Sequence, residues 1–443
     1  MRPACTDWPD EQAMPEEKTV TTEPVWSFRQ MAPSRSREAT ARLAWIVLGI
    51  ACIGSFLLCG LIGYGIWHFW ANAMAPQSGS TLEAFAGPVS LIRAGEAQLI
   101  TVPLAQFVPL HEGETVQVEP SAPPGAAALV TLWDGSTLQL YPGTRVSFAR
   151  LRATRYTARQ QEVRIGVATG VLLVGISPLR LYEEVSFALD LGQALVQLEP
   201  GGSYLVHQGL VPEIAVRSGS AWIVSQGAGE TVPLQAGQKA VLFANRSPII
   251  EKARWELLRN GDFAQDLDGW TFRYDQAWDG GTVNAALSRE KQHIGVQEVW
   301  AARIWRIGGT RDVCLGILSQ EIRQDVSPYN ALRLEFDLRI NYQSLPGGGP
   351  LGTDYPFAVR IRYRDSEGRS QQYTYGFYYR TEPGYLTEMA NGEAILFPHY
   401  RWQHVSLDLA RLRPAPVYLI ALDLFASGHD FNSYVANVSL QAE

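Results

Sequence analysis

The 443-residue sequence contains little charge and few cysteines. Only 18% of its residues are charged and the formal net charge is -7, so the broad basic surface typical of nucleic-acid binding is absent. The four cysteines are Cys5, Cys52, Cys59 and Cys314. Only Cys314 follows the long apolar run described below, so an intrachain disulfide is excluded in that larger part of the chain. Its domains must therefore be stabilised by their hydrophobic cores.

Catalytic signatures are also missing from the sequence. It contains neither the H-E-x-x-H motif of zinc proteases nor the G-x-S-x-G motif of serine hydrolases. His399 and His404 are five residues apart and would face opposite sides of a strand. The sequence therefore predicts a protein that is not an enzyme and needs no cofactor. The alternative is an unrecognised hydrolase whose catalytic carboxylates come from distant positions.

The longest apolar run covers residues 43–70 and contains no Lys, Arg, Asp or Glu. About 20 apolar residues span a bilayer as a helix, so this run predicts one transmembrane helix. A buried helix of a soluble protein is an alternative, but such helices rarely exceed about 14 apolar residues in succession. A cleaved signal peptide has a shorter apolar region of about 7–15 residues. A lipoprotein signal at Cys59 is disfavoured by the bulky Leu57 and Leu58 before it.

Basic residues flank this run on one side. Four arginines lie just before it, Arg29, Arg35, Arg37 and Arg42, whereas the next basic residue after it is Arg93. Because basic segments stay on the cytoplasmic side, the N-terminus is predicted to be cytoplasmic and the bulk of the chain extracytoplasmic. Residues 1–42 are rich in Pro, Glu, Thr and Ser and are predicted to be a disordered tail. The tail would contact either a cytoplasmic regulator or the membrane surface.

Small residues recur at every fourth position of the apolar run, at Ala51, Ser55, Cys59 and Gly63. On a helix this spacing forms one stripe, and small stripes allow transmembrane helices to approach closely. The stripe predicts helix association, either with a second copy or with a partner helix. The alternative is a lone anchor.

The rest of the chain is predicted to be mainly β-structure. Gly and Pro are frequent, and short runs of alternating apolar residues are separated by turn signals such as Asp134-Gly135. Two similar stretches, 162–174 and 213–224, indicate stacked β-arms in a roll or a short solenoid. The predicted order is a stalk at 71–84, a β-domain at 85–244, a linker at 245–256 and a second β-domain at 257–443.

The first β-domain resembles the periplasmic domain of FecR-type regulators. The matching segments are 86–90 (AGPVS), 112–116 (EGETV), 132–140 (LWDGSTLQL) followed by 142–144 (PGT), and 232–238 (VPLQAGQ). The resemblance implies a non-enzymatic β-roll in a single-pass protein that relays an outside signal to a cytoplasmic regulator. This chain departs from the family because its cytoplasmic tail is short and no receptor-contacting domain is visible.

The second β-domain opens with 260–263 (NGDF) and 267–270 (LDGW). This opening resembles that of galactose-binding-like jelly rolls and the related carbohydrate-binding modules. The resemblance implies an antiparallel β-sandwich with a structural calcium held by Asp262 and a carboxylate of the last strand. Ala436 stands where that carboxylate is common, which removes a ligand and makes calcium doubtful.

Aromatic residues concentrate in the second domain. Tyr373, Tyr375, Phe377 and Tyr379 alternate and therefore share one face of a strand, with Trp402 nearby in sequence. Exposed, these rings would stack on sugar rings and form a glycan site. Buried, they would simply be the core face of that strand.

Together these features predict a single-pass envelope protein with two extracytoplasmic β-domains. The leading hypothesis is a FecR-type sensor whose sandwich binds an extracellular ligand such as a glycan or another envelope polymer. The alternative is an envelope scaffold or adhesion protein without signalling.

Overall fold

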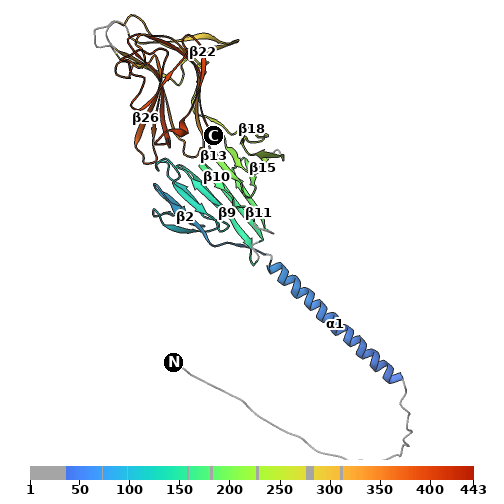
Figure 1. The fold of residues 1–443 in the computed structure, drawn as a ribbon. Coiled ribbons are helices and arrows are strands. Elements are labelled where there is room, and N and C mark those ends of the chain that lie inside the picture. Colours follow the sequence, from blue (N-terminus) through green and yellow to red (C-terminus); the bar gives the residue numbers. More distant parts are fainter. Residues whose placement is uncertain are drawn as a thin grey trace, which may run out of the picture. The chain divides into compact units, whose positions relative to one another are not determined.

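The structure is a computed structural model that describes residues 36–71, 73–96, 98–156, 159–179, 183–225, 229–275, 284–309 and 313–443. Most of the predicted cytoplasmic tail lies outside these residues. The chain divides into two compact units, Met1–Trp70 and Ala71–Glu443. The described part of the second unit is built from β-strands, which confirms the predicted fold class (Figure 1).

Helix α1 (Ser36–Ala71) contains the predicted apolar run (Figure 1). Its segment Thr40–Trp70 is long and apolar enough to cross a membrane. A helix of this length is about 46 Å long, compared with about 30 Å for the hydrocarbon core, so the segment can span with tilt. Ser55 and Cys59 of the small-residue stripe are exposed, and a Cβ added at Gly63 would meet no atom within 4 Å. The stripe is thus free of contacts within the described chain.

Strands β1 to β18 form one closed roll in which two sheets face each other. Sheet A contains β1 (Met74–Pro76), β3 (Val89–Ile92), β4 (Leu99–Thr101), β6 (Thr115–Val118), β9 (Arg145–Thr154), β11 (Glu184–Asp190), β12 (Ala194–Leu198), β15 (Ser220–Ser225) and β16 (Thr231–Gln235). Sheet B contains β2 (Ser80–Ala84), β5 (Phe107–Leu110), β7 (Ala128–Thr131), β8 (Thr137–Leu140), β13 (Ser203–Gln208), β14 (Glu213–Ser218), β17 (Gln238–Val241) and β18 (Ile249–Lys252). The long strand β10 (Gln160–Gly175) belongs to both sheets.

Strand β10 passes from sheet A to sheet B at Gly170. Its first part pairs with β9 and β11, and its last six residues pair with β8 and β13. Gly170 has φ +100°, and a Cβ there would lie 2.3 Å from the Cα of Thr144. The Thr144 hydroxyl donates to the carbonyl of Val171 at 2.7 Å and accepts from its N–H at 3.0 Å. The backbone approach at this corner therefore requires glycine.

The second of the two similar stretches also passes between the sheets. It consists of β14 in sheet B and β15 in sheet A, with Gly219 (φ +82°) between them. A Cβ at Gly219 would lie 2.9 Å from the Cα of Gly202. Both stretches thus share one structural role, since each carries the chain around a corner of the roll at a glycine.

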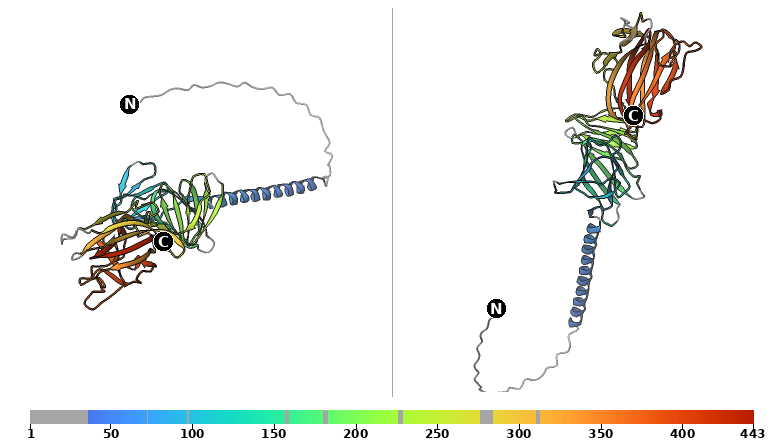
Figure 2. Two further views of the ribbon diagram at one scale, coloured as in Figure 1. Left: turned by 90° about the horizontal axis from the view of Figure 1, so that it is seen from above. Right: turned by 90° about the vertical axis from the view of Figure 1, so that its left-hand side faces the viewer.

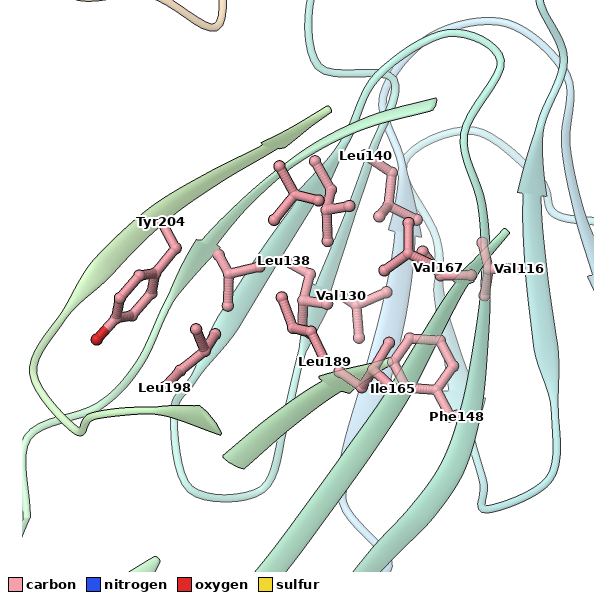
Figure 3. Packing of buried hydrophobic residues seen from close by; sticks show 14 of the residues in the cluster. Val116, Val130, Leu138, Leu140, Phe148, Ile165, Val167, Leu189, Leu198 and Tyr204 are labelled. Atoms are coloured by element: carbon pink, nitrogen blue, oxygen red, sulfur yellow. The ribbon is translucent and has the colours of Figure 1, made fainter. Parts of the chain in front are cut away.

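The core of the roll fills the space between sheets A and B (Figure 3). The labelled side chains point toward one another from both sheets, with Val116, Phe148, Ile165, Val167, Leu189 and Leu198 from sheet A and Val130, Leu138, Leu140 and Tyr204 from sheet B. These side chains are at most 4% exposed. The alternation of apolar residues along short strands therefore specifies a continuous core.

The predicted stalk and linker are parts of sheets rather than connectors. In the stalk at 71–84, β2 pairs with β5 and β7 and buries Leu82 and Ala84 completely. In the linker at 245–256, β18 pairs with β17. Strand β19 (Trp255–Glu256) pairs with the last strand of the second domain. Both stretches are short and rich in polar residues, so their strand pattern is weak in the sequence alone.

The second domain is a sandwich of sheets C and D around a second core (Figure 2). Sheet C contains β21 (Ala286–Ile294), β22 (Gln297–Arg306), β30 (Phe431–Ala442), β24 (Leu332–Gln343) and β28 (Gln403–Asp408), in this order, with β19 beside β30. Sheet D contains β20 (Thr271–Tyr274), β23 (Cys314–Asp325), β29 (Tyr418–Gly428), β25 (Phe357–Arg364), β26 (Ser370–Tyr378) and β27 (Gly392–Leu396). A short 3-10 helix, Leu409–Arg411, follows β28. All pairs are antiparallel except β26 with β27, which confirms the predicted antiparallel β-sandwich.

An aromatic junction joins the outer surface of sheet B to the sandwich. The ring of His207 on β13 stacks on Trp255 at 4.9 Å between centroids, and Tyr329 packs edge-on against His207 at 5.8 Å. Lys239 lies 5.1 Å from the centre of the Trp255 ring. Arg217 of sheet B donates to the carbonyl of Pro328. The domains therefore share a packed contact.

Candidate functional site: the outward face of sheet C

Strand β24 defines the two faces of sheet C. Leu334, Phe336, Leu338 and Ile340 are buried in the core between the sheets. The side chains that alternate with them, including Asp337 and Arg339, point to the other side and are partly exposed. This side, with its register neighbours on β21, β22, β30 and β28, is called the outward face of sheet C.

Strand register places aromatic and polar side chains in rows across this face. Arg303 of β22 pairs with Tyr434 of β30, which pairs in turn with Arg339 of β24. In the adjacent row, Trp305, Asn432 and Tyr342 occupy the same three strands. On the other side, the row consists of Ala301, Ala436, Asp337 and His404.

The two arginines stack on aromatic rings. The Arg339 guanidinium carbon lies 4.5 Å from the Tyr434 ring centre and 5.0 Å from that of Trp402. The Arg303 guanidinium carbon lies 5.4 Å from Tyr434 and 5.1 Å from Trp305. These separations fall within the range of cation–π attraction. The result is a continuous stack of Trp305, Arg303, Tyr434, Arg339 and Trp402, called here the arginine–aromatic stack.

A carboxylate network fixes one end of the stack. Glu290 on β21 accepts hydrogen bonds from Tyr434 Oη at 2.9 Å and from Arg303 Nη1 at 3.2 Å. Ser288 Oγ donates to the same carboxylate at 2.8 Å. Burial opposes ionisation of Glu290, but these donors outweigh it and lower the pKa of its carboxyl. Burial and the bond to Glu290 raise the pKa of Tyr434, so its hydroxyl stays a neutral donor.

One side-chain contact crosses this face. Arg339 Nη2 donates to Gln292 Oε1 at 3.0 Å, although β22 and β30 lie between their strands. In a flat sheet, three strand spacings would separate these backbones by about 14 Å. The two long side chains therefore reach toward each other over the strands between them.

A second carboxylate, Asp337, lies in the neighbouring row. It accepts from Asn437 Nδ2 at 2.7 Å and contacts His404 Nδ1 at 3.1 Å. Asn437 has a φ of +51°, at the register shift where β30 bulges between its pairs with Glu335 and Asp337. The bulge re-aims the Asn437 side chain so that it reaches Asp337.

The outward face of sheet D is covered by the chain itself. Tyr355, Tyr378 and Phe425 form a small buried cluster there, with Met389 packed against it. Further along, Asp423 is fully buried and accepts from Arg360 Nε at 2.9 Å and Arg362 Nε at 3.1 Å. On the outward face of sheet C, by contrast, Tyr342 is exposed and Trp305 and Trp402 are partly exposed.

The predicted sugar-stacking residues lie in three different places. Tyr375 and Phe377 are 7% and 1% exposed and pack in the core between the sheets, with Tyr373 partly buried against them. Tyr375 and Phe377 present no ring to a ligand, so the core alternative describes these two residues. Tyr379 stacks on His399 at 3.9 Å between centroids. Trp402 alone belongs to the arginine–aromatic stack.

The sequence prediction missed four other members of this face, namely Trp305, Arg303, Arg339 and Tyr434. One signal was present in the sequence: polar residues alternate with the apolar core positions along β24. That pattern identifies a solvent-facing side, but it does not show which strands lie beside it.

The predicted calcium ligand Asp262 is exposed, and its Oδ1 accepts from the N–H of Ala264 at 3.1 Å. No group of three His, Cys, Asp or Glu side chains among the described residues could hold a metal ion. Arg289 instead donates to the carbonyls of Phe263 at 2.6 Å and Ala264 at 2.9 Å. A fixed cationic side chain thus binds the carbonyls of this loop.

The chain is similar to solved structures of β-sandwich carbohydrate-binding modules. One is a family 11 module from Clostridium thermocellum in complex with a β-1,3-1,4-mixed-linked tetrasaccharide; identity is 12%, coverage is 42% of this chain and 94% of that chain, and the TM-score is 0.25. Another is a module described for specific mannan recognition, with 13% identity, 43% and 95% coverage and a TM-score of 0.21. Modules described as promiscuous in specificity have 9% identity, 62% and 92% coverage and a TM-score of 0.25.

No family model matches the chain, and no curated protein matches it either. The resemblance to FecR-type regulators therefore stays a prediction.

Proposed function

We propose that this protein is a membrane-anchored envelope protein that binds a glycan on the outward face of sheet C. The observation that carries the proposal is the arginine–aromatic stack, in which both arginines and both tryptophans are partly exposed. Binding sites for small ligands combine apolar and aromatic surface with a few fixed polar groups. This face has both.

The chemistry of the face suits a sugar. A pyranose ring has apolar C–H faces and a rim of hydroxyl groups, so it needs a flat apolar partner and planar hydrogen-bonding groups. Tyr342 is 47% exposed, and Trp305 and Trp402 are partly exposed. Beside them, Asn432 and Arg339 supply planar groups held by their own contacts. Because these groups are already fixed, ordering them on binding costs little.

The test is a polysaccharide binding screen with the full chain in detergent, followed by affinity measurements on Trp402→Ala and Tyr342→Ala. Each variant should weaken the affinity at least tenfold, which corresponds to about 1.4 kcal/mol. Tyr274→Ala is the matched control, because Tyr274 is also exposed (45%) but lies on β20 of sheet D. Wild-type affinity in the Trp402 and Tyr342 variants, or no polysaccharide bound by the wild type, would refute the proposal.

We also propose that the face binds its ligand without hydrolysing it. Glycoside hydrolysis needs one carboxyl that holds a proton as general acid. Donors surround Glu290 and lower its pKa, and Asp337 lies between His404 and Asn437. Both carboxylates are thus held as hydrogen-bond acceptors. Incubation with any bound oligosaccharide should release no new reducing ends, and their steady release would contradict this point.

The sensor hypothesis adds that binding outside is relayed to the cytoplasm, with residues 1–42 inside the cell. Signal transfer would then pass through association of α1 along its small-residue stripe. Replacement of Ser55 and Cys59 by Leu should weaken self-association in a membrane two-hybrid assay. Unchanged association would remove this route and favour the alternative of an envelope scaffold or adhesion protein. Capture of a cytoplasmic regulator by residues 1–42 would instead favour the sensor.

A further inference from the structure

The charges on the outward face of sheet C are unevenly matched. Arg303 has a carboxylate partner, because Glu290 lies 3.2 Å from its guanidinium. Among the described residues, no Asp or Glu lies within ion-pair distance of Arg339, and its acceptor is the neutral amide of Gln292. The carboxylate two residues before it on the same face, Asp337, accepts from Asn437 and contacts His404. Within the described residues, the positive charge of Arg339 therefore has no carboxylate partner.

Two nitrogen donors of the arginine–aromatic stack also lack acceptors within the described residues. The Nε of Arg339 and the Nε1 of Trp402 are buried and have no hydrogen-bond partner in the part of the chain that the structure describes. Buried polar atoms in folded proteins are nearly always hydrogen-bonded, so two such atoms on adjacent, stacked side chains are unusual. Both are donors and neither can accept. The group that would satisfy this place is an acceptor with negative charge.

We infer that the ligand of this face is an acidic sugar whose carboxylate pairs with Arg339. This inference rests on the proposed function, since it specifies the ligand of the same face. A uronic acid carries its carboxylate at the edge of an otherwise apolar ring face, so the ring packs on the aromatic groups while the carboxylate reaches the guanidinium. Guanidinium and carboxylate form paired, charge-assisted hydrogen bonds.

The test compares hexasaccharides from polygalacturonate, alginate and hyaluronate with the same oligosaccharides after reduction of their carboxyls to alcohols. Titration calorimetry on the full chain in detergent should show the wild type binding at least one acidic form about tenfold or more tightly than its neutral form. The preference should shrink at high salt, because the charges are partly exposed.

Two variants isolate the role of Arg339. Gln292→Glu places a carboxylate where Arg339 already has its partner, so it should remove the preference for the acidic form while neutral binding persists. Arg339→Gln should also remove the preference for the acidic form, because it removes the charge, and it should weaken the binding of both forms, because Arg339 belongs to the stack. Arg333→Gln is the matched control, because Arg333 is an exposed arginine of the same strand and face, six residues from the stack. It should keep the preference.

The outcomes separate the inference from the proposed function. Binding that depends on Trp402 but is equal for acidic and neutral sugars overturns the inference alone. Binding of neither form, in this panel and in the wider screen, overturns the proposed function as well. Acetate that competes as strongly as the acidic sugar would show that a carboxylate suffices, which also overturns the inference. If Arg333→Gln lost as much of the preference as Arg339→Gln, the preference would come from the overall charge of the protein, and the inference would be overturned.

Discussion

Acidification should weaken the aromatic junction through His207. Its imidazole packs against the rings of Trp255 and Tyr329, which also contact each other, and Tyr329 Oη approaches its Nε2 at 3.4 Å. Burial, with Lys239 and Arg217 nearby, lowers the pKa of His207 to about 4. The folded protein therefore keeps this histidine neutral at a pH where the unfolded chain protonates it.

The size of the effect follows from the two pKa values. In the unfolded chain a histidine has a pKa of about 6.5. Between this value and about 4, the unfolded state binds a proton that the folded state does not, so stability falls as the pH decreases. This loss of folding stability is close to zero at pH 7 and reaches about 2 kcal/mol at pH 5.

The matched variant is His207→Phe, which keeps a ring against Trp255 and Tyr329 but cannot bind a proton. Thermal unfolding of both proteins at pH 7 and pH 5 gives the test. Other titrating groups are common to both proteins, so their effects cancel in the comparison. Between pH 7 and pH 5, the wild type should lose roughly 4 °C more in melting temperature than the variant. Equal losses would refute the assignment of this pH dependence to a buried neutral His207.

Three further predictions concern stability. Asp423→Asn should lower the free energy of unfolding by about 2 kcal/mol, because it leaves two partly buried arginines without their shared carboxylate; an unchanged urea midpoint would contradict this. Gly170→Ala should lower the free energy of unfolding by at least about 2 kcal/mol more than Gly192→Ala does. Gly192 is the control because it also has positive φ but has open space around it. Equal losses in the two variants would count against the tight corner at Gly170. The melting temperature should be the same with calcium as with EDTA, and a rise with calcium would show a metal site. Arg289→Gln should lower the melting temperature, because Arg289 donates to the carbonyls of Phe263 and Ala264.

Much of the fold could be predicted because its signals are local. An uninterrupted apolar run specifies the long helix, and alternating apolar residues specify the strands of both domains. The stalk and linker assignments failed where strands are short. Strand β2 has five residues, and its burial becomes evident only once β5 and β7 lie beside it.

The candidate site was less predictable because its members are distant in sequence. Arg303, Arg339 and Tyr434 come together through the register of β22, β24 and β30, and no local pattern reports that register. The alternating aromatics of β26 gave the stronger local signal, but alternation alone does not distinguish a core face from an exposed one. Trp402 was identified as an aromatic residue, and its partners became evident only in the folded sheet.

The most direct test of the account is a crystal structure of the protein with an oligosaccharide that it binds. The account predicts that the sugar lies on the outward face of sheet C, against Trp402 and within hydrogen-bond distance of Arg339. A sugar bound elsewhere, with the arginine–aromatic stack free of ligand, would contradict it.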